Sequence, residues 1–152
     1  MGTECAKRFQ VFGCHVVGVA RTVTDNKYYQ NIVEWDKLDQ ELAAADIVVL
    51  AVPLTDETKN LVNESRLELL KEGSVLVNVA RGGLVDTNAL MTHISRLGGA
   101  VLDVFEEEPL AEESPLWDMD NVIVSPHNSF VGDGNRERLL ITLLENINNI
   151  EE

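Results

Sequence analysis

An apolar run at residues 75–80, VLVNVA, most restricts what this chain can fold into. A run of this length and composition is typical of a strand that is buried on both faces of a parallel sheet. Arg81, Gly82 and Gly83 follow it directly, so a permanent cation stands where the chain leaves the strand. Ligands bind beyond the carboxyl ends of such strands, and an arginine there can hold a carboxylate with two hydrogen bonds. An arginine beside two glycines can equally be a surface charge at a turn. The other residues of the chain are needed to distinguish a ligand-binding arginine from a surface charge.

Strands and helices are predicted to alternate along the remaining sequence. Apolar runs predict further strands at 15–20, 46–52, 100–105 and 122–124. Helical spacing of apolar residues, or a capping residue before them, predicts helices at 4–9, 35–45, 64–70, 87–94 and 136–150. Residues 25–31 are expected to form a loop. This alternation predicts an α/β fold with a doubly wound, mostly parallel sheet.

The helix and strand at the amino end have the pattern of the second half of a βαβ unit. A strand and a glycine-rich turn normally precede such a helix, and only Gly2 is in a position to belong to that turn. The dinucleotide pattern G-x-G-x-x-G therefore cannot be tested, and Gly2 can equally be the residue after an initiator methionine. We expect one Rossmann-like domain over residues 1–152 that lacks the first strand and most of the glycine-rich turn.

The acidic composition restricts the partners. The 152-residue chain has 26 Asp and Glu against 12 Lys and Arg, a formal charge of −14, which argues against nucleic acid and anionic membranes. A local site can still be positive and bind a small anion. Cys5 and Cys14 form neither a disulfide framework nor a metal site, and no signal peptide or membrane span is apparent. A cytoplasmic protein without a metal is expected.

Ionisable residues of different kinds stand at the ends of several predicted strands. Arg81 follows one strand, Asp103 lies inside the next with Glu108 shortly after it, and His127 follows the last. Because parallel strands end at one edge of a sheet, we expect Arg81, Glu108 and His127 to face one cleft. An arginine can bind a carboxylate, a histidine can exchange a proton near neutral pH, and a carboxylate can hold that histidine protonated. The residues alone predict a pocket for a small anion with acid–base capacity.

Each of these residues also has a purely structural interpretation. A histidine after a strand is often only a surface or hydrogen-bonded residue, and acidic residues 106–108 can form a solvated loop. Asp103 is harder to explain in this way, because a carboxylate inside an apolar strand needs hydrogen-bond partners.

Three segments in this order resemble the cofactor domain of the D-isomer-specific 2-hydroxyacid dehydrogenases. They are VNVARGGLVDTNAL at 77–90, GAVLDVFEEEPL at 99–110 and SPLWDMDNVIVSPHNSF at 114–130, and AVPLTDETKNLVN at 51–63 is also similar. The resemblance implies reversible hydride transfer between a nicotinamide cofactor, NAD or NADP, and a small 2-keto acid. His127 would protonate the carbonyl oxygen, Glu108 would raise the pKa of His127, and Arg81 would bind the substrate carboxylate and carbonyl.

The same resemblance implies cofactor contacts and a partner. Gly2 would be the last glycine of the pyrophosphate-binding turn, at a helix amino end. The full set of expected cofactor-binding residues is Gly2, Arg21, Thr22, Val52, Pro53, Thr58, Ala80 and Asp103. The cofactor domain of this family commonly carries the dimer interface, so a homodimer is expected, in which the loop with Trp117 and the apolar tail could take part.

The chain departs from the family pattern in three ways. The substrate domain, which both ends of a complete enzyme form, is absent, so we expect poor cofactor binding and negligible activity from the chain alone. The connection over residues 91–99 is shorter than usual, which is either a tight loop or missing residues. Ala20 stands where NAD-selective members have an acidic residue, and Arg21 and Thr22 follow it. Without that carboxylate, Arg21 could pair with a 2′-phosphate, which favours NADP over NAD.

Two other functions remain open. The same fold serves dinucleotide-sensing binding proteins such as the C-terminal binding protein corepressors, which resemble this family and keep similar motifs. The chain could also be only a structural dimerisation unit. The substrate itself is open between glyoxylate, hydroxypyruvate, phosphoglycerate and bulkier keto acids, which gives a glyoxylate/hydroxypyruvate reductase-like or a phosphoglycerate dehydrogenase-like enzyme.

Overall fold

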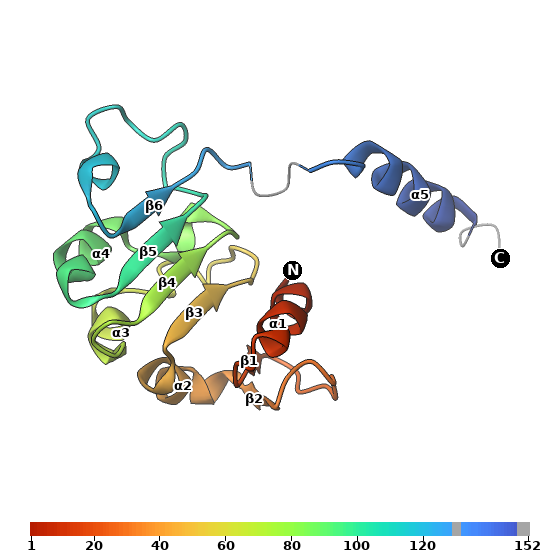
Figure 1. Ribbon diagram of the computed structural model, residues 1–152, viewed down its shortest axis with the longest axis horizontal. Coiled ribbons are helices and arrows are strands. Elements are labelled where there is room, and N and C mark those ends of the chain that lie inside the picture. Colours follow the sequence, from red (N-terminus) through yellow and green to blue (C-terminus); the bar gives the residue numbers. More distant parts are fainter. Residues whose placement is uncertain (129–131, 149–152) are drawn as a thin grey trace.

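The computed structural model describes residues 1–128 and 132–148 (Figure 1). All of its described strands are parallel, and they form two sheets. The larger sheet has the order β3-β4-β5-β6, with β3 at Ile47–Leu50, β4 at Val75–Asn78, β5 at Gly99–Leu102 and β6 at Val122–Val124. The smaller sheet pairs β1 (Val17–Ala20) with β2 (Asn31–Glu34). The predicted doubly wound parallel α/β fold is confirmed, with its sheet divided in two.

The division falls between β1 and β3. Among the described strands, β1 pairs with β2 alone and β3 pairs with β4 alone, so each has one edge without a strand partner. Strand β2 was not predicted, since residues 25–31 were expected to form a loop and the strand begins at Asn31. Only Ile32 and Val33 are apolar in β2, too few to show a strand period, and the pairing with β1 supplies the structure that the local sequence does not.

The helices lie close to their predicted positions. They are α1 (Gly2–Val11), α2 (Leu38–Ala44), α3 (Glu64–Leu69), α4 (Thr87–His93) and α5 (Asn135–Asn148). The side chains of Asn63 and Asp86 accept the backbone N–H groups of Arg66 (3.1 Å) and Ala89 (3.0 Å), so they cap α3 and α4 as expected. Positions 149 and 150 of the expected last helix lie outside the described residues. No helix in the described ranges has the length and apolarity needed to cross a membrane.

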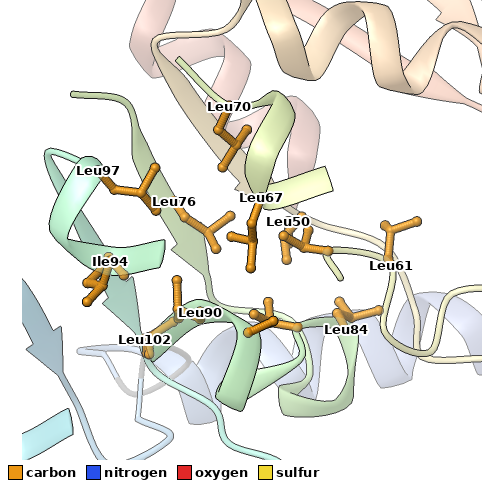
Figure 2. Packing of buried hydrophobic residues seen from close by; sticks show 14 of the residues in the cluster. Leu50, Leu61, Leu67, Leu70, Leu76, Leu84, Leu90, Ile94, Leu97 and Leu102 are labelled. Carbon is orange, nitrogen blue, oxygen red and sulfur yellow. The ribbon is translucent and has the colours of Figure 1, made fainter. Parts of the chain in front are cut away.

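The hydrophobic core lies between the larger sheet and helices α2, α3 and α4. Figure 2 shows Leu67 of α3 beside Leu50 and Leu76 of the sheet, with Leu90 of α4 nearby. The expectation that the strand at 75–80 is buried on both faces is wrong, because burial in β4 alternates and Val75 and Val77 are only half-buried. The other face of the sheet is less covered, and Ile123 of β6 is 64% exposed. Helix α5 extends away from the sheet instead of packing on it (Figure 1).

Residues 91–99 run from the last turn of α4, which ends at His93, to the start of β5 at Gly99. A 3-10 turn over Ile94–Arg96 follows α4, and the N–H of Gly98 then donates to the carbonyl of Ser74 (2.9 Å). A Cβ on Gly98 would lie 2.3 Å from the carbonyl oxygen of Gly73, so only glycine permits this close approach. The chain enters β5 at Gly99, three residues after the end of this 3-10 turn.

The turn after β4 lies directly against the segment after β5. A Cβ added to Gly82 would lie 1.9 Å from both the carbonyl carbon and the carbonyl oxygen of Phe105. No side chain fits there, and the contact is between two backbones that carry the candidate site residues Arg81 and Glu108. Gly82 therefore brings the ends of β4 and β5 together.

We expect Gly82→Ala to lower the free energy of unfolding by about 1–3 kcal/mol, because the added methyl overlaps backbone that has to move. Gly83→Ala is the matched control: it adds the same methyl in the same 3-10 turn, but meets only the Leu54 side chain at 3.2 Å. Urea unfolding of both variants measures the difference. Equal stability of the two variants would contradict the close backbone contact.

Candidate active site

The carboxyl ends of β4, β5 and β6 form one edge of the larger sheet. Asn78, Leu102 and Val124 are aligned across the three strands by their register. Arg81 and His127 each follow three residues after this aligned row, on the strands that flank β5. Neighbouring strands lie about 4.8 Å apart, so side chains from all three ends can reach a common ligand.

The strongest feature at this edge is the pair formed by His127 and Glu108. Nδ1 of His127 lies 2.7 Å from Oε2 of Glu108, and the other carboxylate oxygen accepts the backbone N–H of Phe105 (3.0 Å). The two side chains are 40% and 35% exposed, so both can be reached from solvent. Residues 106–108 could also have been a solvated loop. The side chain of Glu108, however, contacts His127.

The pKa of Glu108 is shifted by this environment. The hydrogen bond from His127 has the largest effect and lowers the pKa of Glu108, and the bond from the Phe105 N–H lowers it further. Partial burial and the nearby Asp103 carboxylate act in the opposite direction but do not reverse the shift. Glu108 therefore stays ionised well into the acidic range and can stabilise a positive charge on the imidazole.

Asp103 holds the segment that carries His127. Its side chain is 1% exposed, and one carboxylate oxygen accepts both the hydroxyl of Ser125 (2.6 Å) and the backbone N–H of Asn128 (3.0 Å). These bonds fix the residues on both sides of His127, whose φ of 50° is unusual for a residue other than glycine. The partners that a buried carboxylate requires are therefore found in the loop after β6.

Arg81 is positioned by a buried asparagine. The side-chain amide of Asn78 donates to the carbonyl of Arg81 (2.9 Å), and its oxygen accepts the N–H of Ala80 (3.2 Å). The guanidinium of Arg81 donates to the carbonyl of Ala80 (2.6 Å), and its side chain is exposed at the same edge. Within the described residues, the structure thus joins His127 to Glu108 and places Arg81 on their edge without an ion pair to either.

Three positioning residues were missed by sequence reasoning: Asn78, Ser125 and Asn128. Asn78 carries a visible signal, because it is the one polar residue in the apolar run VLVNVA. Ser125 and Asn128 carry none, since a serine and an asparagine after a strand are ordinary loop residues. Their role depends on the carboxylate of Asp103, which lies far away in the sequence.

The amino end of α1 lies beside the carboxyl end of β3. A Cβ on Gly2 would be 3.3 Å from the Tyr29 hydroxyl and 3.5 Å from Cβ of Ala51, so this helix end is close to the segment after β3. A helix amino end favours an anion, since its first N–H groups have no partner in the helix. This placement fits the pyrophosphate of a dinucleotide bound along the same edge.

The other residues expected to contact a cofactor fall into two groups. Thr58 is buried, and its hydroxyl donates to the carbonyl of Pro53 (2.7 Å) and accepts the N–H of Thr55 (2.8 Å), so it stabilises the turn after β3. The remaining residues line the approaches to the edge: Val52 is half-buried, Pro53, Arg21 and Thr22 are exposed, and Ala80 is buried at the end of β4. A helix amino end, a cation and apolar side chains suit the phosphates and rings of a dinucleotide.

Two hollows of the described chain lie away from this edge. One of about 260 Å³ lies along the β1–β2 connection, between Val23 and Ile32, and one of about 280 Å³ lies at the amino ends of β4, β5 and β6. Neither is lined by Arg81, Glu108 or His127. In the ranges that the structure describes, no group of acidic, histidine and cysteine side chains is arranged to hold a metal.

We expect His127→Gln to raise the pKa of the Glu108 carboxyl toward that of an ordinary glutamate, because the variant removes the group that lowers it most. In the native protein, the stabilisation from this pair is present at neutral pH and is lost as the pH falls through the lowered pKa of Glu108. Carboxyl ¹³C NMR over a pH series measures the pKa. His15→Gln, an exposed histidine away from this edge, should leave it unchanged. An equal pKa of Glu108 in the native protein, His127→Gln and His15→Gln would contradict the contact between His127 and Glu108.

Comparisons with known proteins agree with this geometry. Residues 1–129 match the sequence profile of the D-isomer specific 2-hydroxyacid dehydrogenase NAD binding domain. The chain is 40% identical over 149 residues to the glyoxylate reductase of Pyrococcus horikoshii. This alignment covers 97% of this chain and 44% of that protein. The chain spans less than half the length of the curated relatives it matches.

Solved structures show the same likeness. One is that of the NADPH-dependent glyoxylate/hydroxypyruvate reductase of Sinorhizobium meliloti in complex with NADP and sulfate. It is 30% identical, with a TM-score of 0.88, and the match covers 99% of this chain and 49% of that one. A second similar structure is that of a D-isomer specific 2-hydroxyacid dehydrogenase of Xanthobacter autotrophicus in complex with NADPH and MES. It is 43% identical, with a TM-score of 0.72, and the match covers 76% of this chain and 37% of that one. The chain therefore belongs to the D-isomer specific 2-hydroxyacid dehydrogenase family and corresponds to its NAD-binding domain.

Proposed function

We propose that this chain is the cofactor-binding part of an oxidoreductase that transfers a hydride between NAD(P)H and a small 2-keto acid. The reverse reaction would oxidise a D-2-hydroxy acid. The observation that carries the proposal is the 2.7 Å contact between Nδ1 of His127 and Glu108 at the carboxyl edge of the sheet. Relatives named glyoxylate reductase support a glyoxylate/hydroxypyruvate reductase-like substrate range, and a phosphoglycerate dehydrogenase-like range is the nearest alternative.

His127 acts as the general acid in the reduction. With Nδ1 bound to the Glu108 carboxylate, the ring presents Nε2 on its opposite side, and this nitrogen delivers the proton to the substrate carbonyl oxygen. The hydrogen bond to the Glu108 carboxylate fixes the orientation of the ring. In the oxidation direction, the neutral imidazole takes the hydroxyl proton back.

Arg81 binds the substrate carboxylate. Its guanidinium lies at the same edge, where a planar pair of donors matches a carboxylate and can also polarise the neighbouring carbonyl. The bonds from Asn78 set the turn that carries Arg81, so the backbone of this turn does not need to be ordered when the substrate arrives. A bound nicotinamide supplies the hydride that reaches the carbonyl carbon.

NADP is the preferred cofactor in this proposal. The chain has Ala20, and no acidic residue, at the end of β1, and Arg21 and Thr22 follow. A carboxylate at this position would repel a 2′-phosphate and bind the ribose hydroxyls of NAD. Its absence, together with a cation one residue later, favours the phosphorylated cofactor. The NADP and NADPH complexes of similar proteins support the same choice.

A binding protein that senses dinucleotides is the main alternative. It would use the same helix end and strand edge but would not need the proton transfer from His127. Because such sensors keep similar motifs, the pair of His127 and Glu108 does not by itself separate the two functions. The relatives named glyoxylate reductase and (S)-sulfolactate dehydrogenase favour the enzyme. Turnover distinguishes the two functions. We also place the protein in the cytoplasm, which suits its two free thiols, Cys5 and Cys14.

A homodimer through this domain completes the proposal. Trp117 is 49% exposed in the loop before β6, and α5 exposes a row of large apolar side chains: Leu139, Leu140, Leu143, Leu144 and Ile147. Exposed apolar surface of this kind commonly marks an interface. A second copy of the chain is the partner that we propose for it.

The activity is tested in a chimaera in which this chain replaces the matching segment of the Pyrococcus horikoshii glyoxylate reductase. We expect reduction of glyoxylate or hydroxypyruvate, with kcat lowered about 10²–10⁴-fold by His127→Gln, because the general acid is lost. Arg81→Lys should mainly raise KM for the keto acid, because lysine cannot bind a carboxylate with two parallel hydrogen bonds. The decrease in NADPH absorbance at 340 nm gives the reaction rate, from which kcat and KM of each variant are obtained.

The control for this experiment is His15→Gln, which should leave both constants unchanged. The chain alone should show negligible turnover under the same conditions. Activity that is indifferent to His127 would contradict the mechanism, and a folded chimaera that binds NADPH without turnover would favour the sensor. Full turnover by the chain alone would contradict the need for a second domain.

The cofactor preference is tested by Arg21→Asp in the same chimaera. We expect the ratio of NADPH to NADH affinity to fall about tenfold or more, because an attractive charge becomes a repulsive one beside the 2′-phosphate. Fluorescence titration with each cofactor gives the two dissociation constants. An unchanged ratio would contradict the preference, and Arg8→Asp, a change of the same charge on α1, serves as the control.

Sedimentation equilibrium tests the dimer. We expect Trp117→Ser and Leu143→Asn each to weaken self-association, since each replaces exposed apolar surface with a polar group. Lys59→Ser is the control, an exposed residue in the turn after β3. A native chain that is monomeric at high micromolar concentration would contradict the proposal.

A further inference from the structure

An ion pair bridges the two sheets at their carboxyl edges. Nη2 of Arg21, directly after β1, lies 3.1 Å from Oε2 of Glu57, in the turn after β3. The side chains are 64% and 75% exposed, so solvent and ligands reach both. Arg21, which the sequence suggested as a free cation for a 2′-phosphate, therefore already has an anionic partner.

The turn that carries Glu57 is well fixed. The buried Thr58 hydroxyl bonds to Pro53 and Thr55, which both precede Glu57, and the N–H of Lys59 donates to the carbonyl of Thr55 (2.9 Å). The carboxylate of Glu57 is therefore presented from a rigid base, whereas the arginine side chain is long and exposed. When a second anion approaches, Arg21 is the partner that can move.

Other charges near Arg21 do not take this role. Glu34 ends the neighbouring strand β2 and is opposite Ala20 in the register, and Asp56 precedes Glu57 in the same turn. The ion pair formed by Arg21 is with Glu57. Asp56 has the same charge one residue away, which makes it a natural control.

We propose that Glu57 is a cofactor-specificity residue, whose carboxylate competes with the 2′-phosphate of NADP for the guanidinium of Arg21. This inference rests on the proposed function, in which the end of β1 receives the adenosine ribose. A phosphate has more charge than a carboxylate and displaces it from Arg21, but the ion pair with Glu57 has to break first, which takes part of the binding free energy. Glu57 thus limits the preference for NADP that Arg21 creates.

The test compares two probes that differ only in the 2′-phosphate, adenosine 2′,5′-bisphosphate and 5′-AMP, binding to the full chain. Dissociation constants come from ¹⁵N-resolved NMR titrations at low salt, which detect weak binding. Exposed ion pairs are weak, so we expect Glu57→Gln to tighten binding of the bisphosphate about two- to fivefold and to leave 5′-AMP unchanged. Asp56→Asn should have a smaller effect. In an Arg21→Gln background, Glu57→Gln should have lost most of its effect.

Each other result counts against the proposal. If Glu57→Gln changes both probes equally, or matches Asp56→Asn, the carboxylate acts only through overall charge. If Glu57→Gln has no effect while Arg21→Gln still weakens the bisphosphate, the 2′-phosphate site stands and Glu57 has no role in it. If the bisphosphate binds no better than 5′-AMP, or neither binds, the inference fails together with the proposed NADP preference.

Discussion

The candidate site depends on a single buried carboxylate, that of Asp103. Its backbone N–H donates to the carbonyl of Asn78 (3.0 Å) at the end of β4, and its side chain accepts from Ser125 and Asn128 after β6. One residue thus ties the ends of three neighbouring strands. Because a buried carboxylate without these partners would be strongly destabilising, the loop that carries His127 and the core of the sheet are stabilised together.

The two sheets divide the work of dinucleotide binding in this account. The larger sheet carries His127, Glu108 and Arg81, for which we propose a role on the substrate, whereas the smaller sheet ends at Arg21, for which we propose a contact with the cofactor phosphate. Among the described strands no backbone pairing connects the two sheets, and the ion pair between Arg21 and Glu57 spans their carboxyl edges. The exposed faces of β6 and α5 show that this domain leaves much apolar surface for further contacts.

Much of the fold and the position of the acid–base residues could be predicted from the sequence. Apolar runs and capping residues such as Asp86 act locally, so they predict β4 and α4 well. Strand β2 could not be predicted, because its pairing with β1 supplies its stability. The same limit applies to the site: parallel topology placed His127 and Glu108 at one edge, but the bonds of Asp103 and the partner of Arg21 arise between distant segments and leave no local pattern.

The central claim is that Arg81 and His127 serve one ligand at the edge that Glu108 completes. The most direct measurement is an NMR titration of the chain with oxamate, a 2-keto acid analogue, in the presence of NADPH. The account predicts that the guanidinium resonances of Arg81 and the ring resonances of His127 shift together, with one common dissociation constant. Shifts that reach only one of the two, reach neither, or follow different dissociation constants would contradict it.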